Sequence, residues 1–219
     1  MYFPLTVVDD FFDDFNGINE FIDNIKWKEP EKYTMPGLVT DDLDFLNPML
    51  KKRIADKILR LFYHRHTPYN YVMHSAKFYK ITPYGKEYNH QGWIHRDDNN
   101  ILSVLIYIKG DKEHGTSFYK YKPESLNQTQ DMSLKELLFK GGKVLPQHYN
   151  TQLQTHNNCY EETLNVPLVP NRAVVFDSSI YHAVNGLGSE EEPRILLACF
   201  FSDIYAHWYP IPEMKRIKA

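Results

Sequence analysis

The chain has few cysteines, no long apolar run and almost no net charge, and each shortage excludes a class of protein. Its 219 residues include two cysteines, Cys159 and Cys199, which are too few for a disulfide framework. No apolar stretch approaches the roughly 18 residues of a membrane-spanning helix. A formal net charge of −3 leaves no basic field of the kind that nucleic-acid-binding domains present. Neither a nucleic-acid partner nor a membrane partner is therefore expected.

The opening residues also lack the basic stretch and apolar core of a secretory signal peptide. Together with the isolated cysteines, this predicts a cytoplasmic location. Aromatic residues are plentiful, at 15% of the chain within a hydrophobic fraction of 42%. That is enough material for a core without disulfides, and we expect one domain over residues 1–219. The oligomeric state stays open.

The first third of the chain predicts helices and the rest predicts strands. Residues 4–8 indicate a short edge strand, and apolar residues recur at three- and four-residue spacing over 10–25 and 41–63, which is typical of amphipathic helices. Pro48 suits the first turn of the second helix. Residues 1–69 are thus expected to support a β core that spans 70–205.

The predicted strands are short, rich in β-branched and aromatic residues, and separated by turn residues. They are YVMHSAKFYKI, GWIHRD, NILSVLIYI, GTSFYKYK, VPLVP, RAVVFD and RILLACFF. Helices followed by many strands favour helices packed on one face of a β-sandwich or barrel. Residues 122–165 interrupt the pattern and are expected to form a loop or lid, with a short helix at 133–139.

The sequence His95-Arg96-Asp97 carries the clearest chemical signal. Because side chains alternate along a strand, His95 and Asp97 project from the same face and can share one metal ion. His182, at the end of a later apolar strand, is the candidate for a third ligand. Two imidazoles and one carboxylate suit Fe(II) with open positions, although zinc is plausible with the same residues. The alternative to a metal site is a purely structural role, in which Asp97 opens a turn and His182 is a hydrogen-bonded core histidine.

Six segments, in order, resemble the Fe(II)/2-oxoglutarate-dependent oxygenases, and most closely their prolyl-hydroxylase-like branch. They are PLTVVDDFF, KFYKITPYG, WIHRDD, ILSVLIYIKGDKEHGTSFYK, VPNRAVVFDSSIYHAVNG and EEPRILLACFF. The resemblance implies a double-stranded β-helix, which is a jelly roll of the cupin type, with the N-terminal helices packed on one sheet. It also implies His95, Asp97 and His182 as ligands of Fe(II).

The same resemblance implies a co-substrate site for 2-oxoglutarate. Arg194 matches the residue that grips the distal carboxylate, which a guanidinium can do bidentately. Tyr79 matches a tyrosine that contacts the same carboxylate in many relatives. Many relatives also carry a serine or threonine two residues after the arginine, but here that position is Leu196. A further partner for the carboxylate is therefore missing from the pattern.

The expected function is that of a dioxygenase using Fe(II), 2-oxoglutarate and O2 to hydroxylate a C–H bond of a small-molecule or peptidyl substrate. The carboxylate at Asp97 favours hydroxylation over halogenation. His148 and His156, in the 122–165 segment, are weaker candidates for substrate contact, and Trp93 is a candidate for the same pocket as His95. Two alternatives remain: a cupin-like metal enzyme that does not use 2-oxoglutarate, and a non-catalytic binding module on the same fold.

Overall fold

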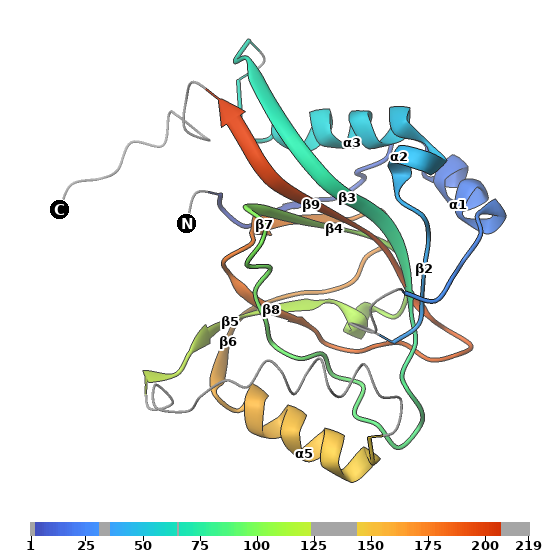
Figure 1. Cartoon of the computed structure of the whole chain (residues 1–219), viewed down its shortest axis with the longest axis vertical. Helices are drawn as coiled ribbons and strands as arrows, with labels where there is room; N and C mark the ends of the chain where they lie inside the picture. Colours follow the sequence, from blue (N-terminus) through green and yellow to red (C-terminus); the bar gives the residue numbers. More distant parts are fainter. Residues whose placement is uncertain (1–2, 31–35, 65, 124–143, 207–219) are drawn as a thin grey trace.

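A computed structural model describes residues 3–30, 36–64, 66–123 and 144–206, and two antiparallel sheets make up most of this part (Figure 1). The larger sheet has the strand order β1-β7-β4-β9-β3-β2, and the smaller has the order β6-β5-β8. The prediction of a mainly β fold with flanking helices is confirmed. In chain order the elements are β1 (Thr6–Val8), α1 (Phe15–Asn24), β2 (Leu38–Val39), α2 (Leu43–Leu46), α3 (Pro48–Leu59), β3 (Tyr69–Ile81), β4 (Leu102–Lys109), a 3-10 helix (Lys112–His114), β5 (Thr116–Tyr121), α5 (Pro146–Asn157), β6 (Tyr160–Val166), β7 (Ala173–Asp177), β8 (Tyr181–Val184) and β9 (Arg194–Ala206).

Both faces of the larger sheet are buried. On one face, side chains of β3, β4, β7 and β9 form a single apolar cluster with residues of α1 and α3. On the other face, Tyr107, Phe176 and Leu196 pack against Phe118 and Val166 of the smaller sheet. A central strand buried on both faces has no need for polar alternation, which explains the nearly continuous apolar run of β4. The molecule is thus layered as helices, large sheet and small sheet.

The helical region differs from the prediction in two respects. The helix expected over 10–25 begins at Phe15, because Asp14 is its N-cap. The helix expected over 41–63 is two helices, because the side chain of Asn47 accepts a hydrogen bond from the backbone N–H of Leu50 at 3.0 Å and Pro48 starts α3. Asparagine is a favoured N-cap, and proline suits the first helical position. The chain therefore restarts a helix at this point.

Helix α1 contacts the larger sheet through an aromatic pair: the ring centroid of Phe21 on α1 lies 6.2 Å from that of Phe78 on β3.

The predicted strands are largely confirmed, with two exceptions. β1 is the expected edge strand: among the described strands, it pairs with β7 alone. The segment VPLVP is not a strand beyond Val166, since Pro167 and Pro170 lack the N–H that a ladder requires. The segment GWIHRD contains only an isolated bridge, between His95 and His182.

The segment expected to be a loop, residues 122–165, contains regular structure. Helix α5 lies within it and strand β6 begins within it, and β6 extends the smaller sheet by pairing with β5. Most of β6 is exposed, so this strand shows no apolar alternation that a pattern could detect. The short helix predicted at 133–139 lies outside the described residues.

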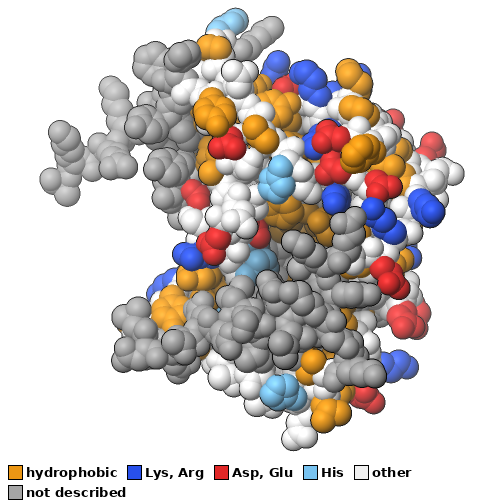
Figure 2. All heavy atoms as spheres, in the orientation of Figure 1, with side chains coloured by type: hydrophobic (Ala, Val, Ile, Leu, Met, Phe, Trp, Pro, Cys, Tyr) orange, Lys and Arg blue, Asp and Glu red, His pale blue; other side chains and the backbone are white. Residues whose placement is uncertain are grey.

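Charged side chains of both signs are mixed on the face that Figure 2 shows. Acidic and basic side chains are interspersed over its helical part, and hydrophobic side chains gather near its middle (Figure 2). Within the residues that the structure describes, no helix has the length and apolar character needed to cross a membrane.

Candidate functional site

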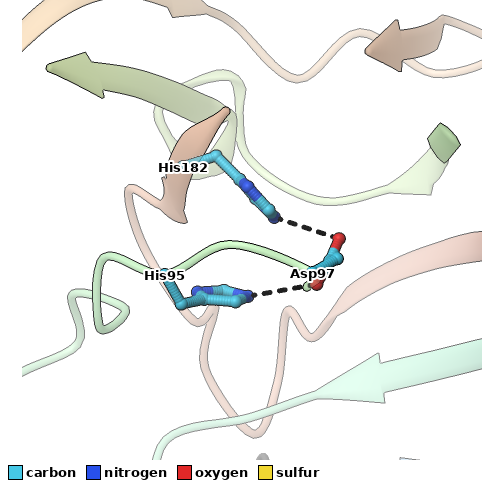
Figure 3. Close-up of side chains that lie close together, drawn as sticks. All are labelled: His95, Asp97 and His182. Atoms are coloured by element: carbon cyan, nitrogen blue, oxygen red, sulfur yellow. Dashed lines mark ion pairs between the residues drawn. The ribbon is translucent and has the colours of Figure 1, made fainter. Parts of the chain in front are cut away.

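Three side chains that could hold a metal ion converge between the two sheets. Candidate ligand atoms of His95, Asp97 and His182 all lie within 4.8 Å of one another. His95 Nε2 is 3.8 Å from Asp97 Oδ1, and His182 Nε2 is 3.6 Å from Asp97 Oδ2. Figure 3 shows all three side chains pointing toward one another. Both separations are below twice a metal–ligand bond of about 2.0–2.2 Å, so one ion can bridge them.

Backbone pairing brings the two histidines together. The N–H of each donates to the carbonyl of the other, at 3.0 Å from His95 and 2.9 Å from His182. A pair that exchanges both bonds places its side chains on one face, and the two ring centroids are 4.5 Å apart. His95 and Asp97 project to the same side as expected, since Nε2 and Oδ1 are 3.8 Å apart, although residues 93–97 contain a single bridge and not a strand.

The tautomers of both imidazoles suit a cation. His95 Nδ1 lies 2.8 Å from the carbonyl oxygen of Trp93, and His182 Nδ1 lies 2.9 Å from that of Ile180. A carbonyl oxygen only accepts, so each Nδ1 carries a hydrogen, and the neutral form of each ring then presents its lone pair at Nε2. The two lone pairs and the carboxylate converge on one point, which is the arrangement of an oriented metal-ligand set.

Two buried serines, Ser103 and Ser178, form a series of hydrogen bonds that ends at the carboxylate of Asp97. Ser103 on β4 donates to Asp97 Oδ2 at 2.6 Å, and its oxygen lies 2.8 Å from that of Ser178. The backbone N–H of Asp97 donates to the carbonyl of Ser178 at 3.0 Å. Because Ser103 gives its hydrogen to the carboxylate, Ser178 donates to Ser103. This series of hydrogen bonds orients Asp97 Oδ2 and leaves Oδ1 turned toward His95.

The three side chains line a cavity of about 370 Å³. Tyr79 and Arg194, the residues expected at a co-substrate site, line the same cavity. The residues that sequence reasoning predicted for metal and co-substrate are thus brought to one space. The rest of the described lining is mostly apolar: Pro36, Ile81, Gly92, Leu105, Val184, Leu187, Leu196, Ala198 and Phe200, with Gln91, Trp93, Thr116 and Tyr149 as the polar or amphipathic members.

Arg194 is a buried cation with neutral partners. It is 3% exposed, and it donates from Nε to the carbonyl of His114 at 2.7 Å and from Nη2 to the hydroxyl of Thr116 at 3.3 Å. Its guanidinium carbon lies 5.4 Å from the centre of the Tyr107 ring. Burial lowers the pKa of this group, but arginine stays charged in proteins. No carboxylate pairs with Arg194 among the described residues, so the cavity has a positive wall suited to an anion.

Thr116 provides the hydroxyl that position 196 lacks. Many relatives carry a serine or threonine at that position, whereas this chain has Leu196, and Thr116 lines the same cavity. Its oxygen accepts from Tyr107 at 2.8 Å as well as from Arg194, which leaves its own hydrogen for another acceptor. Tyr79 pairs with Leu196 across β3 and β9. Burial, and to a lesser degree the charges of Asp42, Cys199 and Asp97, raises the pKa of Tyr79 to about 12. The phenol is therefore a neutral hydrogen-bond donor at ordinary pH.

Other residues of the site lie on α5 and its neighbours. Trp93 lines the cavity as expected, and Tyr149 of α5 lines it as well, with ring centroids 6.3 Å apart. His156 does not line the cavity: its Nε2 lies 2.7 Å from the carbonyl oxygen of Ile94. His148 is exposed. Ser103, Thr116 and Tyr149 carried no sequence signal, because only contacts between distant segments give them a role.

The close approach of Gly92 to β8 leads to a first prediction. A Cβ at this position would lie 2.6 Å from Val184 Cγ1 and 3.1 Å from its backbone N and O. Gly92→Ala should therefore displace the segment that leads to His95 and lower the free energy of unfolding by about 1–3 kcal/mol, measured by urea denaturation. Gly85→Ala is the control, because its Cβ would meet nothing closer than 3.5 Å. Equal stability of both variants would contradict the close packing.

The fold is shared with several solved structures. The epimerase SnoN from nogalamycin biosynthesis, described as non-heme and alpha ketoglutarate dependent, has a TM-score of 0.53 at 9% identity, over 91% of this chain and 78% of that chain. HygX from Streptomyces hygroscopicus, with nickel and 2-oxoglutarate bound, has a TM-score of 0.53 at 12% identity, over 90% and 82%. The carbocyclase SnoK, also from nogalamycin biosynthesis, has a TM-score of 0.51 at 10% identity, over 96% and 83%.

At these identities the likeness shows a common fold. SnoN has also been solved in complex with Fe3+, alpha ketoglutarate and nogalamycin RO. The three side chains of this chain that could hold a metal ion are consistent with the expected Fe(II) and 2-oxoglutarate. No curated protein matches the sequence. The profile of a family of unknown function, DUF6445, matches residues 2–186, and the chain belongs to that family.

Proposed function

We propose that this protein is an Fe(II)- and 2-oxoglutarate-dependent oxygenase. One observation carries the proposal: two imidazole lone pairs and a carboxylate converge in the same cavity as a buried guanidinium that has neutral partners. In this proposal His95, Asp97 and His182 hold Fe(II). The fold is a double-stranded β-helix forming one domain over residues 1–219, and the N-terminal helices support its larger sheet.

The co-substrate pocket follows from the remaining lining residues. Arg194 pairs with the distal carboxylate of 2-oxoglutarate, and the hydroxyls of Tyr79 and Thr116 donate to it or to its neighbouring oxygens. Three donors around a buried anion strengthen one another in a site that excludes water. When bound, Fe(II), 2-oxoglutarate and O2 supply the oxidising chemistry, in which the co-substrate is converted to succinate and CO2 while a substrate C–H bond is oxidised. The protein contributes orientation and a dry cavity.

The substrate is proposed to be a small molecule or a side chain of a peptide. A cavity of about 370 Å³ lies within the range of small-molecule sites, about 300–1,000 Å³. HygX has been solved with hygromycin B bound, which favours the small-molecule choice. Hydroxylation is the proposed outcome, in keeping with the prolyl-hydroxylase-like motifs of the sequence. Because SnoN and SnoK are described as an epimerase and a carbocyclase, product analysis must also detect epimerised or cyclised products.

The proposal is tested by adding Fe(II) and 2-oxoglutarate to the protein without oxygen. A weak visible charge-transfer band should develop, and succinate should form when air is admitted. A metal enzyme that does not use 2-oxoglutarate would bind Fe(II) without producing the band. A non-catalytic module would form no succinate. Absence of both signals in the wild-type protein would overturn the proposal.

Ser103, which donates a hydrogen bond to Asp97, gives a second prediction. Ser103→Ala removes the hydrogen bond that orients the carboxylate and should weaken metal binding by about 10-fold, the low end of the 10- to 100-fold cost of losing an orienting partner. The measurement is a titration with Mn(II) as a stable substitute for Fe(II). Ser117→Ala is the matched control, since Ser117 is also fully buried but bonds Asn165. Equal affinities of the two variants would contradict an orienting role for Ser103.

A further inference from the structure

The segment that carries His95 has an inner edge and an outer edge, and each is paired by a different part of the chain. On the inner edge, Gly92 N donates to the carbonyl of Val184 at 2.9 Å, and His95 exchanges bonds with His182. On the outer edge, no strand of the described residues is paired with this segment. An extended segment with one unpaired edge leaves backbone polar groups that must find partners elsewhere.

Two adjacent side chains at the end of α5 satisfy that outer edge. The Asn157 amide accepts from Ile94 N at 3.1 Å and donates to the carbonyl of Gly92 at 3.0 Å. His156 Nε2, facing the carbonyl of Ile94 at 2.7 Å, donates to it. Three backbone groups on one edge are thus bonded by a helix that is 62–65 residues away in sequence. The side chains of Asn157 and His156 thus form the hydrogen bonds that a neighbouring strand would otherwise provide. We call these three bonds the outer bracket.

The outer bracket bonds the residues on either side of Trp93, whose carbonyl orients His95. Trp93 lies between the two bracketed residues, and its carbonyl oxygen accepts from His95 Nδ1 at 2.8 Å. Any shift of residues 92–94 therefore moves the group that sets the tautomer and ring direction of His95. The inner pairing bonds residues 92 and 95, whereas the N–H and the carbonyl of Ile94 are bonded from α5. The outer bracket therefore restrains the residues between the two inner attachment points.

Helix α5 is itself anchored independently of this bracket. Leu153 is fully buried, and Tyr149 packs against Tyr88 and Trp93. Asn150 forms a second bracket of the same kind, accepting from Asn89 N at 2.7 Å and donating to the carbonyl of Glu87 at 2.9 Å. The helix would thus stay docked without Asn157, and the effect of Asn157 on residues 92–94 can be separated from docking.

We propose that Asn157, assisted by His156, is a positioning residue for the metal ligand His95, so that α5 tunes the metal affinity of the site. The inference rests on the proposed function, because it requires His95 to be a ligand. It makes helix α5 part of the metal centre, although none of the α5 side chains is proposed to touch the ion. Orienting partners of this kind change metal affinity by about 10- to 100-fold.

The test compares Asn157→Ala with Asn150→Ala, which removes the same side chain and the same type of bracket from the same helix. Mn(II) dissociation constants are measured by titration, and thermal unfolding without metal is recorded for each variant. Asn157→Ala should weaken Mn(II) binding about 10- to 100-fold. Asn150→Ala should leave the affinity within a small factor of wild type while lowering thermal stability by a comparable amount.

A second variant covers the case in which Asn157→Ala does not fold. His156→Phe keeps a ring beside Trp93 and Tyr160 but cannot bond Ile94, and it should also weaken Mn(II) binding. Wild-type affinity in the folded Asn157 variant, or in His156→Phe if that variant alone folds, overturns the positioning role. An equal loss in Asn150→Ala overturns it too. Failure of the wild-type protein to bind Mn(II) or Fe(II) instead overturns the proposed function.

Discussion

Asp97→Ala is expected to abolish metal binding and succinate formation while the protein remains folded. Its carboxylate faces both Nε2 atoms, at 3.8 and 3.6 Å, and no second acid belongs to the described cluster. Loss of a direct ligand should exceed the roughly 100-fold upper cost of losing an orienting partner. His182→Ala should have the same effect, because it removes one of only two imidazoles.

The measurement is the rise in melting temperature on adding Mn(II). A ligand at 100 times its dissociation constant stabilises the folded state by about 2.7 kcal/mol, so wild type should shift clearly and Asp97→Ala should not. Asp98→Ala is the control, since this neighbouring carboxylate is 67% exposed and pairs with Arg96. A metal-dependent shift retained in Asp97→Ala would exclude this cluster as the metal site.

Arg194→Met is expected to separate co-substrate binding from stability. Loss of one partner of a buried charge pair costs about 2–5 kcal/mol, which corresponds to a roughly 30- to several-thousand-fold weaker affinity for 2-oxoglutarate. The free energy of unfolding without co-substrate should change much less. Removing the charge also removes the desolvation penalty of a buried ion, which offsets two lost hydrogen bonds worth about 1 kcal/mol each.

Isothermal titration with 2-oxoglutarate and urea denaturation measure the two quantities. Arg194→Lys should lie between wild type and Arg194→Met, since a lysine keeps the charge but not the bidentate geometry. Arg172→Met is the control: this guanidinium is already paired with Asp9, at 2.6 Å, and should not affect 2-oxoglutarate. If Arg194→Met binds 2-oxoglutarate as wild type does, the co-substrate lies elsewhere.

Local patterns predicted most elements because those elements bury one face in a regular period. The apolar spacing of α1 and the β-branched runs of β3, β4, β7 and β9 were all readable in this way. Errors arose where a single residue overrides the pattern, as Asn47 does between α2 and α3. They also arose where a strand is stabilised by its neighbour and not by burial, as β6 is by β5. Neither effect has a periodic signature.

The sequence by itself determined the types of donor and their order: a histidine and an aspartate two residues apart, a distant histidine, and an arginine beyond it. Only the tertiary structure decided that these groups face one cavity, because that depends on the pairing of His95 with His182. It also decided the tautomers, set by the carbonyls of Trp93 and Ile180, and the supporting roles of Thr116 and Asn157. The contacts of Thr116 and Asn157 join segments 78 and 63–65 residues apart, and composition and spacing carry no information on which distant groups will meet.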